Sequence, residues 1–209
     1  DAARKRDLLV EILAARHTEQ VLVFGKTKHG CNRLAEQLEK AGLPAVAIHG
    51  NKSQAQRQKA LTQFKAGKAR ILVATDVAAR GLDIPNLPLV INHDLPMVAE
   101  DYIHRIGRTG RNGASGEALT LVSPEEGGLL RQIQRLLKVE LTMDVVEGYA
   151  PSRPIRLDTP IPKNGGGQRT PSRPAHRPHG KPAPRTAHAG PKQRSGGQGA
   201  YAGRRGSRA

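Results

Sequence analysis

Short apolar runs alternate with segments of helical spacing through the first 149 residues of the chain. The runs are rich in Val and Ile, which is typical of strands buried on both faces, and they cover residues 21–24, 45–48, 71–75, 89–92 and 118–122. The segments between them space their apolar residues as a helix does, and they cover roughly residues 4–15, 28–41, 53–66, 99–106 and 124–138. This alternation predicts an α/β fold, a parallel sheet with helices on both faces and right-handed crossovers.

Local signals support these boundaries. Ser53 is suited to cap the third helical segment, Gly67 to end it, and Gly42 with Pro44 to end the second. In sheets of this kind the functional loops leave the carboxyl ends of the strands. The loops to consider are therefore residues 25–30, 49–54, 75–83 and 93–96.

The chain changes character after Tyr149. Residues 150–209 hold 10 of the 15 prolines, 10 of the 23 glycines and 13 of the 34 Lys/Arg residues, against a single acid, Asp158. Such a segment buries too little apolar surface to offset the entropy of ordering, so we predict a domain over residues 1–149 and a disordered basic tail over 150–209. The tail favours RNA tethering through phosphate contacts, with a solubilising linker as the alternative.

Cysteine use and hydropathy bound the location. The only cysteine, Cys31, forms no internal disulfide, which fits a reducing cytoplasm, and we expect it to be a small buried hydrophobic residue. No apolar run reaches the 18 or more residues of a membrane span, so no membrane partner is expected. The histidines show no metal-ligand spacing with Cys or acids, and we predict no metal site in this chain.

The segment HRIGRTGR at 104–111 is the most unusual in chemical terms. Arg105, Arg108 and Arg111 recur every third residue, with Gly107 and Gly110 between them. Guanidinium groups at fixed spacing suit phosphate recognition, and glycine lets the backbone approach a ligand closely. Spacing alone equally allows a solvated Arg-Gly turn at a helix end.

Two further segments carry polar residues at positions where they are able to contact a ligand. In ATDVAARGLDIP (74–85), Asp83 is able to bind sugar hydroxyls, although Asp76 and Asp83 also suit turns or helix caps. In SQAQRQKALTQFKAG (53–67), Arg57 and Lys59 face outward if Leu61 and Phe64 face the sheet. By itself, that second segment reads as an ordinary amphipathic helix.

Taken together and in order, these segments resemble the C-terminal RecA-like domain of DEAD-box ATP-dependent RNA helicases. VLVFGKTKHG (21–30) resembles motif IV, QAQR (54–57) the Q-x-x-R element, TDVAARGLDIP motif V and HRIGRTGR motif VI. EGYAPS (147–152) and the basic tail resemble the bacterial RhlE-type subfamily. The GxxxxGK[ST] loop and the Asp-Glu-Ala-Asp box of the N-terminal half do not occur in this sequence.

The resemblance implies a role for each matching residue. Arg108 and Arg111 would be arginine fingers reaching the γ-phosphate of ATP, while Gly81 and Asp83 would meet the nucleotide, Asp83 at its ribose. Thr27, Gly50, Arg57 and Thr75 would lie along the RNA backbone, and Arg80 would serve either RNA or the interdomain contact. His104 and Arg105 would bridge to the N-terminal RecA-like domain. Mg²⁺ would accompany ATP, with its ligands on that other domain.

Three functions compete at this stage. The first is half of an RNA-dependent ATPase and helicase that unwinds RNA locally and is inactive alone, with RNA bound largely regardless of sequence and ribosome-assembly or RNA-decay proteins as possible partners. The second is a free-standing RNA-binding or annealing module without ATPase activity. The third is a RecA-like half of another superfamily-two helicase, such as a DNA-unwinding one.

Overall fold

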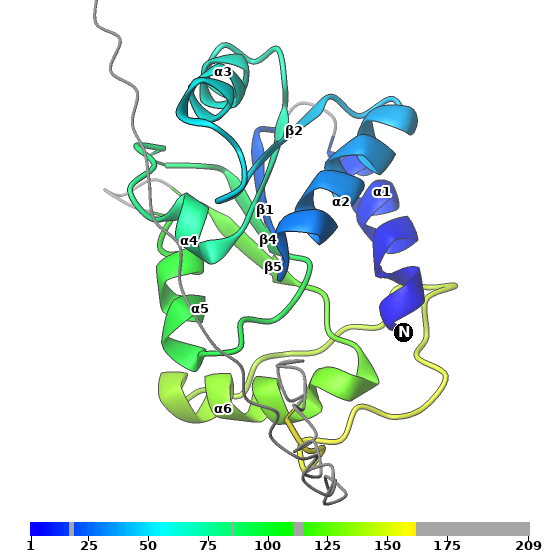
Figure 1. Ribbon diagram of the computed structural model, residues 1–209. Coiled ribbons are helices and arrows are strands. Elements are labelled where there is room, and N and C mark those ends of the chain that lie inside the picture. The colour runs from blue at the N-terminus through cyan, green and yellow to red at the C-terminus, as the bar shows by residue number, and fades with distance from the viewer. Residues whose placement is uncertain (17–18, 85, 111–114, 162–209) are drawn as a thin grey trace, which may run out of the picture. The chain divides into compact units, whose positions relative to one another are not determined.

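The computed structural model describes residues 1–16, 19–84, 86–110 and 115–161 (Figure 1). The strands are β1 (Val21–Phe24), β2 (Ala45–Ile48), β3 (Ile71–Ala74), β4 (Leu89–Asn92) and β5 (Glu117–Thr120). The α-helices are α1 (Lys5–Ala15), α2 (Lys28–Lys40), α3 (Gln54–Lys65), α4 (Asp76–Ala79), α5 (Ala99–Ile106) and α6 (Gly127–Leu137), and two 3₁₀ turns are η1 (Ala2–Arg4) and η2 (Pro124–Glu126). All five predicted strands and all five predicted helices are present, and α4 was not anticipated.

The five strands form one parallel sheet in the order β2-β3-β1-β4-β5. The register aligns Val21 of β1 with Ile71 of β3 and Leu89 of β4, so the strands end at a common level. This confirms the predicted parallel α/β sheet. It also brings the loops that follow the strands to one edge.

Alternation along the strands supplies a core on each face of the sheet. Val21 and Val23 belong to the cluster that packs against α1 and α2, whereas Leu22 and Phe24 belong to the cluster that packs against α3 and α4. Figure 1 shows α1 and α2 on one side of the strands and α3 and α4 on the other. A central parallel strand is apolar at every position because both of its faces are covered.

The third helix begins and ends as its sequence indicated. The Ser53 hydroxyl accepts from the backbone N–H of Gln56, and the Gln56 side chain accepts from the N–H of Ser53, which completes a capping box. Phe64 is buried and Lys59 is exposed, as expected, whereas Arg57 is half-buried. Cys31 is fully buried in the core, as predicted.

Residues 150–161, which the sequence assigns to the tail, pack on residues of the preceding domain. A side chain at Gly127 would collide with the carbonyl of Arg156, and one at Gly128 with the carbonyl of Thr159. Arg153 pairs with Glu125 at 2.5 Å, and Ser152 donates to the carboxylate of Asp1. We call residues 150–161 the strap. Hydropathy gives no sign of this packing, because its contacts include backbone carbonyls seated on Gly127 and Gly128 and polar side-chain pairs.

The rest of the predicted tail, residues 162–209, lies outside the described residues, as does the prediction of disorder there. Within the described ranges, none of the helices has the length and apolar character needed to cross a bilayer. In the same ranges no three His, Cys, Asp or Glu side chains gather as metal ligands would.

Candidate functional site

The carboxyl edge of the sheet gathers loops that are far apart in the sequence. Thr27 follows β1, Gly50 follows β2 and Thr75 follows β3, and these three strands are neighbours. Lys28 donates to the side chain of Asn51 at 2.8 Å, which joins the loop after β1 to the loop after β2. Three of the residues that the sequence associates with an RNA backbone therefore lie along one edge.

Thr27 and Thr75 both occupy N-cap positions, but only the side chain of Thr27 makes a capping hydrogen bond. The Thr27 hydroxyl accepts from the backbone N–H of Gly30 at 3.0 Å and so caps α2. Thr75 occupies the N-cap position of α4 and makes no capping bond with its side chain. Gly50 is exposed, and an added Cβ there would meet nothing within 4 Å.

Arg105 lies at the centre of the site and is only 1% exposed. Its Nε and Nη2 donate to the two carboxylate oxygens of Asp76 at 2.6 and 2.8 Å, and its Nη1 donates to Asn92 Oδ1 at 3.0 Å and to the Asp94 carbonyl at 2.6 Å. The guanidinium also lies 4.9 Å from the ring centroid of Phe24. One cation from α5 thus contacts residues at the ends of β1, β3 and β4.

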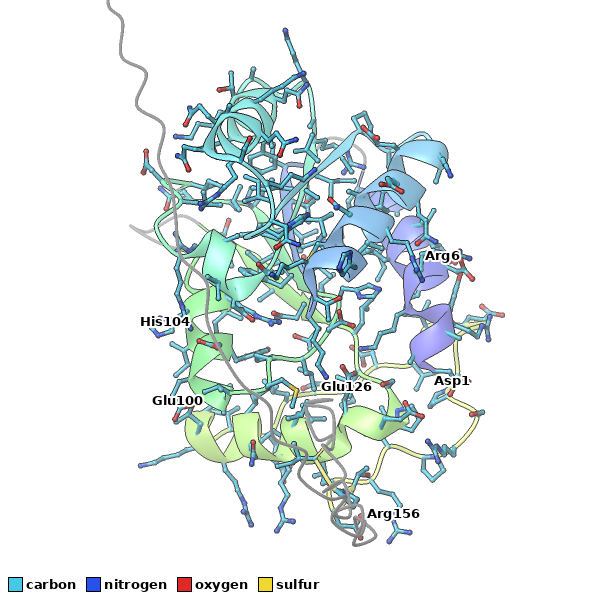
Figure 2. All side chains as sticks on the ribbon, viewed as in Figure 1. Asp1, Arg6, Glu100, His104, Glu126 and Arg156 are labelled. Carbon is cyan, nitrogen blue, oxygen red and sulfur yellow. The ribbon has the colours of Figure 1, made fainter. Side chains whose placement is uncertain are left out.

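His104 and Arg105 differ in position although both were expected at a contact with another domain. His104 is exposed, and Figure 2 shows it on α5 with its side chain directed away from the sheet. Arg105 is engaged inside its own domain. Its partner Asp76 is 25% exposed, so the pair lies just beneath the surface.

Arg108 is turned onto the loop that follows α4. Its Nη1 donates to the Leu82 carbonyl at 2.9 Å and its Nη2 to the Ala79 carbonyl at 3.1 Å. Since Gly81 and Asp83 belong to this same loop, three of the four residues predicted to meet a nucleotide lie together. The fourth, Arg111, is outside the described residues.

The loop that follows α4 is exposed at Gly81 and Asp83. Asp83 is 88% exposed and its carboxylate lies 3.4 Å from the ammonium group of Lys65. Gly81 has a φ of +80°, a backbone conformation that glycine adopts without strain, and its Cα faces open space. The chain therefore turns at Gly81.

Arg80 and Arg57 are placed differently from each other. Arg80 is exposed and forms an ion pair with Asp101 of α5. Arg57 lies in the first turn of α3, after the loop that contains Gly50, and its buried Nε has no partner among the described residues. Arg80 is thus tied to α5, whereas Arg57 belongs to the edge formed by β2 and α3.

Asp94 is a site residue that the sequence did not indicate. Its Oδ2 accepts from the backbone N–H of Lys26 at 2.9 Å, and its Oδ1 lies 3.2 Å from His93 Nδ1. Burial alone would raise the pKa of Asp94, but the hydrogen bond and charge of His93 and the N–H of Lys26 outweigh it, and the pKa falls to about 2. Asp94 is therefore ionised and fixes the loop after β1.

The comparisons with known proteins agree with this geometry. Residues 4–113 match the family described as the helicase conserved C-terminal domain. The chain belongs to this family, in its DEAD-box branch. The predicted RecA-like fold is confirmed by solved DEAD-box structures.

Individual relatives show the extent of the match to this helicase C-terminal domain. It is 44% identical over 168 residues to the DEAD-box ATP-dependent RNA helicase CshA of Bacillus subtilis, covering 77% of the chain and 34% of the relative. It is 47% identical over 119 residues to DEAD-box ATP-dependent RNA helicase 30 of Arabidopsis thaliana, covering 57% and 20%. The E. coli DEAD-box protein SrmB, solved bound to the regulator of ribonuclease activity RraA, superposes with a TM-score of 0.68 at 34% identity, covering 78% of this chain and 93% of that one. The chain therefore spans a fifth to a third of the length of these curated relatives.

Proposed function

We propose that this helicase C-terminal domain works as one half of an ATP-dependent RNA helicase and remodels RNA locally together with an N-terminal RecA-like half. One observation carries the proposal. Arg108 and the Gly81–Asp83 loop lie together in the part of the domain that follows α4, while Thr27, Gly50 and Thr75 lie along the edge formed by β1, β2 and β3. Because a nucleotide site and an RNA site would lie on the same sheet, ATP binding and RNA binding would be coupled.

The residues around Gly81 fit a nucleotide. Asp83 presents an exposed carboxylate, paired only with the exposed Lys65 among the described residues, to ribose hydroxyls, and Gly81 leaves room for the ligand to approach the backbone. Arg108 donates to two neutral carbonyls and keeps its charge available for phosphate oxygens. We propose the same phosphate-binding role for Arg111, which lies outside the described residues. ATP with Mg²⁺ supplies the phosphoanhydride bond, and we expect the metal ligands on the other half.

RNA is proposed to run past Thr27, Gly50, Arg57 and Thr75. A hydroxyl, a bare backbone and a guanidinium recognise phosphate and sugar and carry no base information, so binding should be largely independent of sequence. Arg80 serves the interdomain contact rather than RNA in this proposal, because its ion pair with Asp101 ties it to α5 beside His104. Arg105 acts as a positioning residue behind them.

We further propose that residues 1–161 form the domain and that residues 162–209 tether RNA by charge, in a protein of the RhlE-type subfamily that works in the cytoplasm. The strap packs on the domain, and the basic residues beyond it are suited to phosphate contacts. The neighbour SrmB is bound to a ribonuclease regulator in its solved structure, which supports RNA-decay proteins as partners, with ribosome-assembly proteins as the alternative.

The test joins this domain to an N-terminal RecA-like half and measures ATP hydrolysis with and without RNA. The domain alone should be inactive and the joined protein active. Arg108→Ala should lower hydrolysis by about 10³-fold or more, since an arginine finger typically contributes about 10³–10⁵ in rate. RNA affinity, measured by fluorescence anisotropy, should stay within about twofold because the tail contacts remain.

Two alternatives would give other results. A free-standing annealing module would speed strand annealing in the domain alone, and joining it to an N-terminal half would add no hydrolysis. A DNA-unwinding enzyme would be stimulated more by DNA than by RNA. Lys59→Ala is the matched control for Arg108→Ala, because it removes an exposed cation on α3 that is outside the Gly81–Asp83 loop.

A further inference from the structure

Asn92 is a fully buried polar residue at the carboxyl end of β4. Its Oδ1 accepts from Arg105 Nη1 at 3.0 Å, and its Nδ2 donates to Thr120 Oγ1 at 3.2 Å. Thr120 Oγ1 in turn lies 3.2 Å from the hydroxyl of Tyr102, which belongs to α5. The amide of Asn92 is therefore oriented by β5 and α5, and it presents its oxygen to the buried guanidinium.

Arg105 depends on such an acceptor because it is buried. A guanidinium has five N–H donors, and Arg105 makes four hydrogen bonds with them, two to Asp76, one to Asn92 and one to the Asp94 carbonyl. If the Asn92 oxygen were replaced by a methyl group, one Nη1 donor would face an apolar surface, and the guanidinium would rotate or shift to satisfy it. Any such movement disturbs the two hydrogen bonds to Asp76.

The ion pair to Asp76 joins two segments with separate duties. Asp76 directly follows Thr75, on the proposed RNA edge, and Arg105 precedes Arg108 by three residues. Arg108 closes the other end by binding the carbonyls of Ala79 and Leu82. The segment 75–83 is thus attached at two places, through Asp76 to Arg105 and through the carbonyls of Ala79 and Leu82 to Arg108. The Asn92 amide supports the more buried attachment, which is the one between Arg105 and Asp76.

We propose that Asn92 is a positioning residue for RNA-stimulated ATP hydrolysis: it fixes Arg105, and through Arg105 it keeps the Thr75–Asp83 segment in register with Arg108. The inference rests on the proposed function. Asn92 touches neither ligand, so its effect should fall on the rate of hydrolysis at saturating RNA and not on ATP binding.

The experiment uses the joined protein and the variants Asn92→Leu, Asp76→Asn and their double variant. Asn92→Leu should lower kcat by about 10-fold and leave the KM for ATP within about threefold, which marks the loss of an interaction needed only in the transition state. Because both residues act through Arg105, the double variant should be no slower than the slower single variant, whereas independent effects would multiply.

Gln20→Leu is the matched control. It removes a side-chain amide that donates to the Phe64 carbonyl at 2.6 Å, at the opposite end of the sheet, so it loses a comparable bond without touching Arg105. Thr120→Val is the second variant should Asn92→Leu not fold. It removes the shared partner of Asn92 Nδ2 and of the Tyr102 hydroxyl but leaves the Asn92 oxygen on Arg105, so it should lower kcat by a smaller factor, about threefold.

A kcat for Asn92→Leu within about twofold of Gln20→Leu, or multiplicative effects of Asn92→Leu and Asp76→Asn, would overturn the proposal. Nuclear magnetic resonance of the 209-residue chain labelled with ¹⁵N-arginine gives an independent reading. The Arg105 Nε–H signal, assigned with Arg105→Lys, should exchange slowly with water and should shift in Asn92→Leu but not in Gln20→Leu. If the joined wild-type protein lacked hydrolysis, the proposed function would fail, and this signal would still decide whether Asn92 fixes Arg105.

Discussion

Arg105 donates to both carboxylate oxygens of Asp76, at 2.6 and 2.8 Å, across 29 positions of sequence. A bidentate pair of this kind is directional, since the planar guanidinium matches the carboxylate only in one plane. It therefore fixes the orientation of α5 relative to the first turn of α4.

Arg105→Ala should lower the free energy of unfolding by about 3 kcal/mol, because it leaves Asp76 and the oxygens of Asn92 and Asp94 without their donor. The value lies at the lower end for a broken buried pair because Asp76 is 25% exposed and retains some water. Urea unfolding followed by circular dichroism measures it. Arg105→Lys, which keeps the charge but not the fork, should recover only part of the loss, and a change below about 1 kcal/mol for Arg105→Ala would contradict the assignment.

Gly128→Ala should detach the strap, because the added methyl group would collide with the carbonyl of Thr159. Trypsin should then cut the bond between Arg156 and Leu157 at least about threefold faster, as expected for a locally opened segment. Mass spectrometry of the fragments measures this rate. Gln132→Ala, on the exposed face of α6, is the control and should leave the rate unchanged.

Cys31 should resist thiol reagents in the folded protein. Burial, and next the negative charge of Asp94, raise the pKa of its thiol to about 12, so at pH 8 only about 10⁻⁴ of it is thiolate. A colorimetric disulfide reagent should react fully with the Cys31 thiol in 8 M urea, chosen as the denaturing solvent, and very slowly in buffer. Rapid reaction in buffer would mean that the core around Gly25 and Cys31 is open.

His49 should make the domain less stable below neutral pH. Burial, and then the charges of Lys52, His29 and Lys28, lower its pKa from 6.5, so the unfolded chain binds a proton that the folded domain rejects. Stability from this group is complete above pH 6.5 and declines as the pH falls from there towards the folded pKa. The urea midpoint should drop between pH 7.5 and pH 5.5 (the two assay conditions) in the wild type, and less in His49→Gln. Equal drops in the two proteins would assign the effect to other histidines.

The sheet and its order of elements were predictable because β1, β3 and β4 are short apolar runs that are buried along their whole length, and because α2 and α3 carry capping residues of their own. Ser53 and Gly67 each act locally, so their roles are legible in sequence. The contact between Arg108 and the loop that contains Gly81 and Asp83 is observed, whereas the nucleotide-binding role that the sequence suggests for these residues stays a prediction.

The connections between distant segments were not predictable from local patterns. Asp76 looked like a helix cap, yet its carboxylate serves Arg105 of α5. Asn92 and Asp94 looked like the end of a strand and the start of a turn, and only the parallel register brings them to Arg105. The strap was missed for a different reason, because backbone carbonyls seated on two glycines leave no trace in hydropathy.

Arg105 and Arg108 sit three residues apart but are held with very different strength. Arg105 is bound to the carboxylate of Asp76, which is 25% exposed, whereas Arg108 donates only to two neutral backbone carbonyls. A phosphate oxygen is a stronger acceptor than either carbonyl. Arg108 can therefore exchange the carbonyls for a phosphate at a small cost in free energy, while Arg105 stays in place. The C-terminal end of α5 therefore carries Arg105, which stays bound to Asp76, and is followed by Arg108, which can change partner. A ligand with two negative charges would draw Arg108 away from its carbonyls and leave Arg105 in place.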